Sequence, residues 1–154
     1  MPGRADLTTR SSAATFVVNS LAAKAQSVAE IEAKLARRGV TPEVAAGVVA
    51  EAIRLGYLDD AELAGQLARG FVARGYGRRR AATTLRRRGL PAGVVDAALA
   101  EAYGALDEVT LARAALGSRA TDDDASRRRA ASFLARRGFS SAAAWQAVRA
   151  GRSD

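Results

Sequence analysis

Clusters of arginine are the feature of this sequence that could bind another molecule. The 154-residue chain carries 24 Lys and Arg against 16 Asp and Glu, which gives a formal net charge of +8. Eight Arg and no acidic residue lie between Glu62 and Asp96, and seven Arg and no acidic residue lie between Asp124 and Asp154. Charge that served only solubility would mix both signs. The clusters therefore predict contact with a polyanion or with an acidic protein surface.

Residues that commonly catalyse reactions are scarce. The absence of Cys and His excludes disulfides, thiolate nucleophiles, zinc fingers and His-based acid–base catalysis. The sequence contains no Gly-rich phosphate loop and no nucleophile–base set. The consecutive side chains of Asp122–Asp124 diverge at a helix start, where they complement the helix dipole rather than hold a metal. We therefore expect a protein that is not an enzyme and that uses no cofactor and no metal.

Hydropathy predicts a protein that does not contact a membrane. No stretch approaches the roughly 18 apolar residues of a membrane span, and Met1–Ser12 lacks the apolar core of a signal peptide. We expect a cytoplasmic monomer.

A five-residue pattern recurs along the chain and carries many of the arginines. Its leucines lie 50 and 49 residues apart. A near-constant period of this size indicates repeated structural units rather than one unique core. The three copies are Leu35-Ala36-Arg37-Arg38-Gly39, Leu85-Arg86-Arg87-Arg88-Gly89 and Leu134-Ala135-Arg136-Arg137-Gly138.

Helix start and stop signals divide each unit into three helices. Ser27 and Glu30 form a capping-box pattern, Gly39 is a typical helix stop, and Thr41-Pro42 is a typical start. Asp59 and Thr121 are further predicted caps. The first unit has helices at about 12–25, from Ser27 to Gly39, and from Thr41. The other units have helices near 60–75, 78–88, 92–103, 108–118, 122–137 and 141–149.

These elements predict an all-α fold of three tandem three-helix repeats with an elongated shape. Alanine supplies roughly half of the apolar residues, and because it buries little area we expect thin cores and modest stability. We predict a disordered N-terminus over 1–11, repeats over 12–57, 58–104 and 105–150, and a C-terminal tail over 151–154. The side chains expected to pack inside or at the junctions are Val44, Val48, Ile53, Tyr57, Phe71, Tyr76, Phe133 and Trp145.

The basic residues gather on the outward face of two middle helices. If Ala81 and Leu85 point inward, at about 100° per residue the opposite face carries four Arg around Thr83. The equivalent face of the third repeat is also basic, whereas that of the first is almost neutral. The Arg just before each Gly are explained equally well by attraction to the helix C-terminus. The predicted binding residues are Arg74, Arg78, Arg79, Arg80, Arg86, Arg87, Arg128, Arg129 and Arg136.

A helix-turn-helix that reads base sequence is a less favoured interpretation. Such a module places its base-contacting residues on the second helix of the pair. Here the third helices carry Glu43, Glu51, Asp96 and Glu101 and little positive charge, while the Arg lie on the middle helices. Aromatic residues are also too few for a platform on which bases stack.

Four segments, in the same order along the chain, resemble the bacterial RecX family. The resemblance covers about residues 12–150, and the chain departs from it at Ala22–Ser27, where relatives carry more Arg. The matching segments are Gly56-Tyr57-Leu58-Asp59-Asp60-Ala61-Glu62-Leu63-Ala64, Arg74-Gly75-Tyr76-Gly77-Arg78-Arg79-Arg80, Leu85-Arg86-Arg87-Arg88-Gly89-Leu90 and Phe133-Leu134-Ala135-Arg136-Arg137-Gly138-Phe139-Ser140.

The resemblance implies a curved rod of three-helix repeats and a regulator of the RecA recombinase. Family members bind the filament of RecA on single-stranded DNA and usually inhibit its ATPase, strand-exchange and coprotease activities. The RecA filament is therefore the expected partner. The alternative is a sequence-nonspecific protein that binds single- or double-stranded DNA directly and acts without RecA. A third alternative is a protein scaffold in which the clustered Arg have no binding role.

Overall fold

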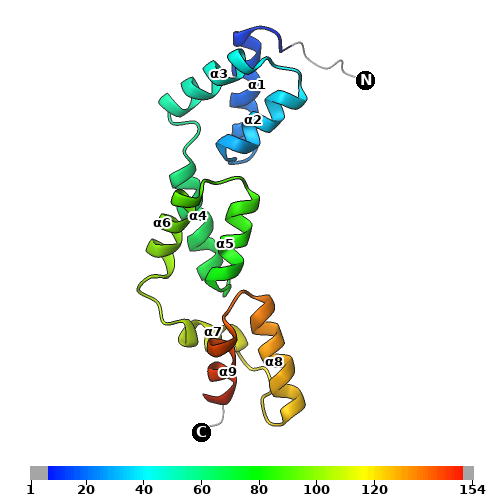
Figure 1. The fold of residues 1–154 in the computed structure, drawn as a ribbon, viewed down its shortest axis with the longest axis vertical. Helices are drawn as coiled ribbons and strands as arrows, with labels where there is room; N and C mark the ends of the chain where they lie inside the picture. Colours follow the sequence, from blue (N-terminus) through cyan, green and yellow to red (C-terminus); the bar gives the residue numbers. More distant parts are fainter. Residues whose placement is uncertain (1–6, 151–154) are drawn as a thin grey trace. The chain divides into compact units, whose positions relative to one another are not determined.

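The computed structural model describes residues 7–150, and all regular elements in this part of the chain are α-helices (Figure 1). Their order is three helices in each predicted repeat, so the all-α fold of tandem three-helix repeats is confirmed. The helices are α1 (Arg10–Ala23), α2 (Val28–Arg37), α3 (Pro42–Arg54), α4 (Asp60–Ala73), α5 (Arg78–Arg87), α6 (Ala92–Tyr103), α7 (Glu108–Leu116), α8 (Asp124–Arg136) and α9 (Ser141–Ala150).

Most helix ends follow the signals in the sequence. Ser27 and Glu30 form both hydrogen bonds of a capping box at the start of α2. The Thr41 side chain accepts a hydrogen bond from the Val44 backbone at the start of α3, and the Asp59 carboxylate accepts one from the Glu62 backbone N–H at 3.1 Å. The backbone polar groups at these ends are therefore satisfied locally.

Two helix starts differ from the prediction. The segment 1–11 was expected to be disordered, yet α1 begins at Arg10 and Leu7 is buried in the core; residues 1–6 and the predicted tail 151–154 lie outside the described residues. The predicted Thr121 cap of α8 is wrong, because Asp123 caps this helix in a capping box with Ser126. Apolar packing of Leu7 extends the ordered chain beyond what the polar composition of the first residues indicates.

Two side chains expected to pack are instead exposed. Ile53 is 49% exposed and Tyr57 is 53% exposed. Both lie at or just after the end of α3. This helix packs against the core through Val48, Val49 and Ala52, and Ile53 and Tyr57 are not part of that buried face. Phe71 is buried as predicted, and Phe133 and Trp145 are partly buried against the core of the third repeat.

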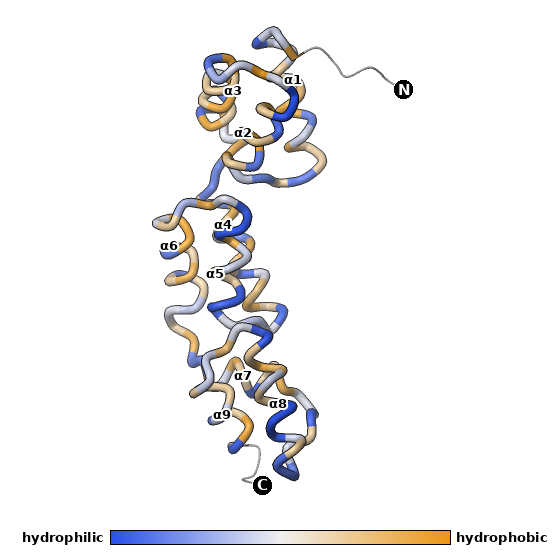
Figure 2. Tube along the Cα trace, turned by 45° about the vertical axis from the view of Figure 1, so that its right-hand side comes forward, coloured by the Kyte–Doolittle hydropathy of each residue, from blue (hydrophilic) through white to orange (hydrophobic). Residues whose placement is uncertain are grey.

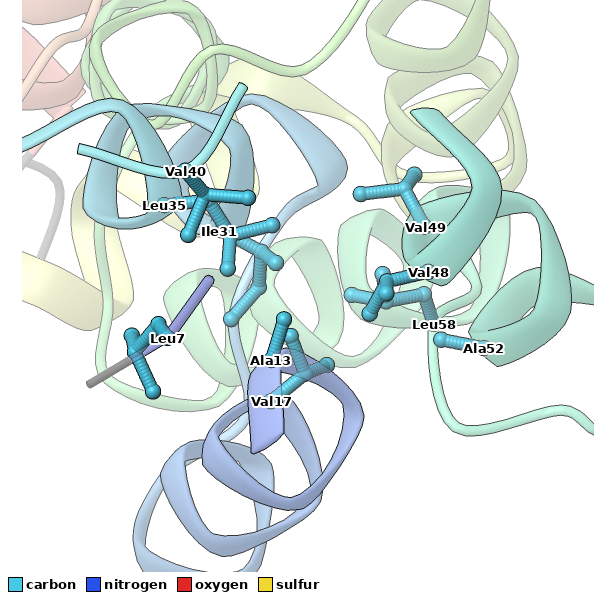
Figure 3. Close-up of a cluster of buried hydrophobic side chains, with 10 residues drawn as sticks. All are labelled: Leu7, Ala13, Val17, Ile31, Leu35, Val40, Val48, Val49, Ala52 and Leu58. Atoms are coloured by element: carbon cyan, nitrogen blue, oxygen red, sulfur yellow. The ribbon is translucent and has the colours of Figure 1, made fainter. Parts of the chain in front are cut away.

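The chain divides into two compact units. The first comprises the residues up to Leu63 together with Arg88–Leu90; the second comprises Ala64–Arg87 and the residues from Pro91 onward. Side chains from α1, α2 and α3 and from the segments beside these helices form the core of the first unit (Figure 3). The buried cluster there is Leu7, Ala13, Val17, Ile31, Leu35, Val40, Val48, Val49, Ala52 and Leu58.

The cores of the second unit are rich in alanine. Around α7, α8 and α9 the buried cluster contains large side chains such as Leu116, Leu134 and Phe139 beside five alanines. Figure 2 shows hydrophilic stretches along α5 and α8, which contain the Arg runs. Small side chains let these helices approach closely, and they leave most of the long charged side chains outside.

Candidate anion-binding site

Backbone hydrogen bonds join the end of α8 to the start of α5 inside the second unit. The Gly77 N–H donates to the Arg137 carbonyl at 2.8 Å, and the Arg79 N–H donates to the Gly138 carbonyl at 3.3 Å. A Cβ added to Gly138 would lie 2.4 Å from the Arg80 nitrogen, so only glycine permits this approach. The joint brings the arginines of both helices to one place.

This joint also explains why arginines tolerate the first turn of α5. The N–H groups of a helix start carry partial positive charge, which disfavours cations nearby. Here the carbonyls at the end of α8 accept from two of those groups, and the Arg80 guanidinium donates to the Arg136 carbonyl at 3.1 Å. Its hydrogen bond to the Arg136 carbonyl is therefore one structural reason why Arg80 is tolerated at the start of α5.

Four of the predicted residues line one hollow between α5 and the end of α8. The hollow has a volume of about 380 Å³. The side chains of Arg79, Arg80, Thr83 and Arg87 reach it from α5, and Arg136 reaches it from α8. The hydroxyl of Thr83 is turned to its own helix, donating to the Arg79 carbonyl at 3.0 Å. The hollow is thus surrounded mainly by guanidinium groups.

Two further hollows continue this surface along α8. The larger, of about 670 Å³, includes Arg128, Arg129 and Arg136, and the other, of about 520 Å³, includes Arg79 and Arg128. Because the three hollows share residues, they form one continuous area, and no acidic residue lines any of them. We call this area the α5/α8 surface. Its arginines are Arg79, Arg80, Arg87, Arg119, Arg128, Arg129 and Arg136.

Three of the predicted residues lie outside the α5/α8 surface. Arg74 donates to the Gly70 carbonyl at 3.2 Å and lies over the ring of Phe71. Arg78 lines a separate hollow that also contains Glu108. Arg86 is exposed on α5 but lines none of these hollows.

Sequence analysis missed one residue of the surface, Arg119. It follows the end of α7, and its guanidinium carbon lies 3.7 Å from the centre of the Phe133 ring, a stacked cation–π geometry. The comparison of middle-helix faces could not find it, because it belongs to the connection before α8. Its proximity in sequence to the Arg128–Arg129 pair was the available signal.

Two other arginines in the same unit hold the structure together. Arg127 donates to the carbonyls of Thr121 and Asp122 and pairs with Asp124 at 3.0 Å, which fixes the start of α8. Arg137 donates to the Arg74 carbonyl at 2.9 Å and lies over the Tyr76 ring. Neither was among the predicted binding residues.

Guanidinium groups lie over the aromatic rings near the α5/α8 surface. The Tyr76 ring faces Arg74, Arg80 and Arg137, and the Phe133 ring faces Arg119 and Arg137. Stacking of a nucleic-acid base needs an uncovered aromatic face. The arrangement can therefore bind phosphate or carboxylate groups through the arginines, and it offers little to a base.

A buried tyrosine supports the segment that carries Tyr76. The Tyr103 hydroxyl donates to the Tyr76 carbonyl at 2.9 Å. Burial raises the pKa of Tyr103 to about 12, since the phenolate would lose its hydration. The hydroxyl thus stays protonated and keeps this hydrogen bond across the physiological range.

Within residues 7–150 no helix is both long enough and apolar enough to cross a membrane. The fold and the α5/α8 surface together define a class: this is an all-α protein of tandem three-helix repeats that carries a strongly basic surface.

The chain belongs to the RecX family. Residues 59–99 match the family profile described as RecX, second three-helix domain. Regulatory protein RecX of Mycolicibacterium vanbaalenii is 33% identical over 163 residues, an alignment that covers 97% of this chain and 88% of that protein. The resemblance predicted from the sequence is confirmed.

Other relatives agree on the family and on the fold. Regulatory protein RecX of Deinococcus radiodurans is 39% identical over 140 residues, covering 87% of this chain, and the match spans 65% of that protein's length. A crystal structure of RecX from Lactobacillus salivarius superposes with a TM-score of 0.77 at 18% identity, covering 92% of this chain and 95% of that chain. The latter similarity concerns the fold alone.

Proposed function

We propose that this protein regulates the RecA recombinase, without being an enzyme, by binding the RecA filament on single-stranded DNA in the cytoplasm. The expected effect is inhibition of the ATPase, strand-exchange and coprotease activities. Membership of the RecX family supports the regulatory role, because the relatives are named regulatory proteins. The α5/α8 surface is the structural observation that carries the proposal, since its hollows are lined by several arginines and by no acidic residue.

The partner of the α5/α8 surface is anionic. A filament presents many copies of the same protein surface and many DNA phosphates at once. A chain of tandem repeats that contacts several of them gains affinity by multivalency, which favours the filament over free RecA. The arginines would be divided between RecA carboxylates and DNA phosphates, both of which accept bidentate hydrogen bonds from guanidinium.

The test is inhibition of RecA ATPase on single-stranded DNA by an Arg79→Glu, Arg87→Glu double variant. The matched control is Arg113→Glu, Arg149→Glu, which changes the charge of the second unit equally at exposed positions outside the three hollows. We expect the inhibitory concentration to rise by about tenfold or more for the first variant, a loss of about 1.4 kcal/mol. Equal inhibition by both variants, with unfolding temperatures like that of the wild type, would reject the assigned surface.

Direct binding to nucleic acid is the second candidate function. It is favoured by the arginines that line the hollows of the α5/α8 surface. Because guanidinium groups cover the rings of Tyr76 and Phe133, its contacts would be to phosphates rather than to bases. Such binding is insensitive to sequence and weakens steeply with salt. Binding of a labelled oligonucleotide at two salt concentrations, with and without RecA, separates the two candidates: tight binding and full effect without RecA would favour this second one.

A further inference from the structure

The first unit contains a basic hollow that the comparison of helix faces did not predict. It lies between α1 and α2 and has a volume of about 490 Å³. Half of the residues that line it are cationic and none is acidic. These residues are Phe16, Asn19, Ser20, Lys34, Arg37 and Arg38.

This hollow is the counterpart of the largest hollow in the α5/α8 surface. The first and third copies of the repeated pattern are 99 residues apart. At this spacing Arg37 is equivalent to Arg136 and Ser20 to Arg119, and both of these arginines line the hollow of the third repeat. In both hollows a guanidinium lies over a partly buried phenylalanine ring: Arg38 lies 4.8 Å from the centre of the Phe16 ring, and Arg119 lies 3.7 Å from that of Phe133. The repeat geometry therefore creates a similar basic hollow twice, from different residues.

Hydrogen bonds inside the hollow orient its polar groups as donors. The Ser20 hydroxyl oxygen accepts from the amide of Gln26 at 3.0 Å and from the ammonium of Lys34 at 2.9 Å. A hydroxyl oxygen has two acceptor positions and one proton, so the Ser20 proton stays available to a ligand. Gln26 is only 5% exposed, and it also donates to the Ser20 carbonyl. The buried Gln26 side chain therefore fixes the position of Ser20 in the hollow.

The remaining donors of the hollow point to the same class of ligand. The Lys34 ammonium has three N–H groups and uses one of them on Ser20. Asn19 is exposed and contributes an amide. A ligand at this place would meet ammonium, guanidinium, amide and hydroxyl donors, and this combination matches the oxygens of a phosphate group.

We propose that this hollow of the first repeat binds backbone phosphates of single-stranded DNA, and that the chain contacts a strand through both of its units. The proposal deepens the proposed function and rests on it, because it names DNA as the ligand of a second site. Phosphate is favoured over an acidic protein surface because the hollow lacks an apolar anchor: Arg38 covers Phe16, and protein interfaces depend on buried aromatic anchors.

The experiment measures binding of a labelled oligothymidylate to the full chain without RecA, over a range of salt concentrations. The site variant is Lys34→Gln, Arg37→Gln. The matched control, Lys24→Gln, Arg54→Gln, removes two exposed positive charges from the same unit outside the hollow. A second site variant, Asn19→Asp, changes one exposed residue and so preserves the fold. RecA ATPase inhibition by every variant is measured in parallel.

We expect the site variant to bind about tenfold more weakly than the control, a difference of about 1.4 kcal/mol. The slope of log affinity against log salt should shrink by about 1.4, since each phosphate contact on a single strand contributes about 0.7. Asn19→Asp should weaken binding in the same direction.

Three results would overturn the proposal. The first is equal binding by the site variant and its control. The second is loss of RecA inhibition in the site variant with unchanged DNA binding, which would assign the hollow to protein. The third is failure of the wild type to bind the oligonucleotide. In that last case, the parallel ATPase measurement still decides the proposed function on its own.

Discussion

An ion pair holds the joint between repeats in the first unit, whereas a guanidinium that lies over an aromatic ring holds the joint in the second. In the first, Arg88 pairs with Glu30 at 2.8 Å and donates to the Ala25 carbonyl at 3.0 Å. In the second, Arg137 occupies the equivalent position but donates to a carbonyl and covers Tyr76. The last arginine of the repeated pattern is therefore a structural residue in both, and the chemistry of its partners is free to differ.

The glycines of the repeated pattern differ in whether another segment of the chain packs against them. All three have positive φ, at 77°, 76° and 96° for Gly39, Gly89 and Gly138. A Cβ added to Gly89 would lie 2.6 Å from the Ala29 side chain, whereas one added to Gly39 meets nothing within 4 Å. Glycine is needed at the first copy for its backbone conformation alone, and at the other two copies also for close approach.

Replacement of Gly138 by alanine should give the largest loss of stability. The left-handed conformation costs a non-glycine residue about 1–2 kcal/mol, and a collision with the Arg80 backbone adds an overpacking cost. We expect a total of about 3 kcal/mol for Gly138→Ala and about 1–2 kcal/mol for Gly39→Ala, measured by urea unfolding. If both variants lost the same free energy of unfolding, the joint between α8 and α5 would accommodate the added methyl group without an overpacking cost.

Replacement of Arg137 by glutamine should cost about 2 kcal/mol, because the variant loses a hydrogen bond and cation–π contacts. The neighbouring Arg136 is exposed, so Arg136→Gln should change the free energy of unfolding by less than about 0.5 kcal/mol. It should instead weaken anion binding. If Arg136→Gln lowered stability and Arg137→Gln weakened only anion binding, the structural and binding roles given to these two residues would have to be exchanged.

The ion pair in the first unit should make stability depend on pH. Burial opposes ionisation of Glu30, but hydrogen bonds from Arg88 and Ser27 outweigh it and lower its pKa. A lowered pKa in the folded state stabilises the fold above the ordinary value near 4.5, and that contribution is lost as the pH falls through the lowered pKa.

Glu30→Gln should therefore cost about 1 kcal/mol at neutral pH, and the difference from wild type should shrink as the pH falls below the ordinary value near 4.5 and vanish once the pH is below the lowered pKa of Glu30. Thermal unfolding at several pH values measures it, and the exposed Glu32→Gln variant is the control. A difference that stays constant with pH would contradict the ion-pair explanation of this joint.

Removal of the Tyr103 hydroxyl should have an effect no larger than that of Glu30→Gln. Tyr103→Phe leaves the Tyr76 carbonyl without its donor and should cost about 1 kcal/mol. Tyr57→Phe, at an exposed position, should cost nothing measurable. Because the pKa of Tyr103 is raised to about 12 in the folded state, wild type should lose stability as the pH rises from about 10 to about 12, and the Phe variant should lack this loss.

Local signals predicted the helices well because capping is a local interaction. Ser27, Thr41 and Asp59 accept hydrogen bonds from residues three positions along, which the sequence alone contains. Leu7 and Ile53 were mispredicted for the opposite reason. Whether an apolar side chain is buried depends on what packs against it from elsewhere, and that is decided by tertiary contacts.

The candidate site was predictable in part. Charge runs and helix periodicity found Arg79, Arg87, Arg128 and Arg136, which meet on the α5/α8 surface. They could not find Arg119, nor the hollow around Lys34, because both depend on how a first helix or its connection lies beside a middle helix.

By itself the sequence determined the all-α repeat, its helix ends and the two acid-free arginine runs, since propensity, capping and charge are properties of neighbouring residues. Only the tertiary structure decided which arginines bind carbonyls and rings inside the joints and which remain on the surface. The reason is geometric: Arg136 and Arg137 are adjacent in sequence, but about 100° of helix rotation separates them. One therefore lines the α5/α8 surface, and the other lies over Tyr76.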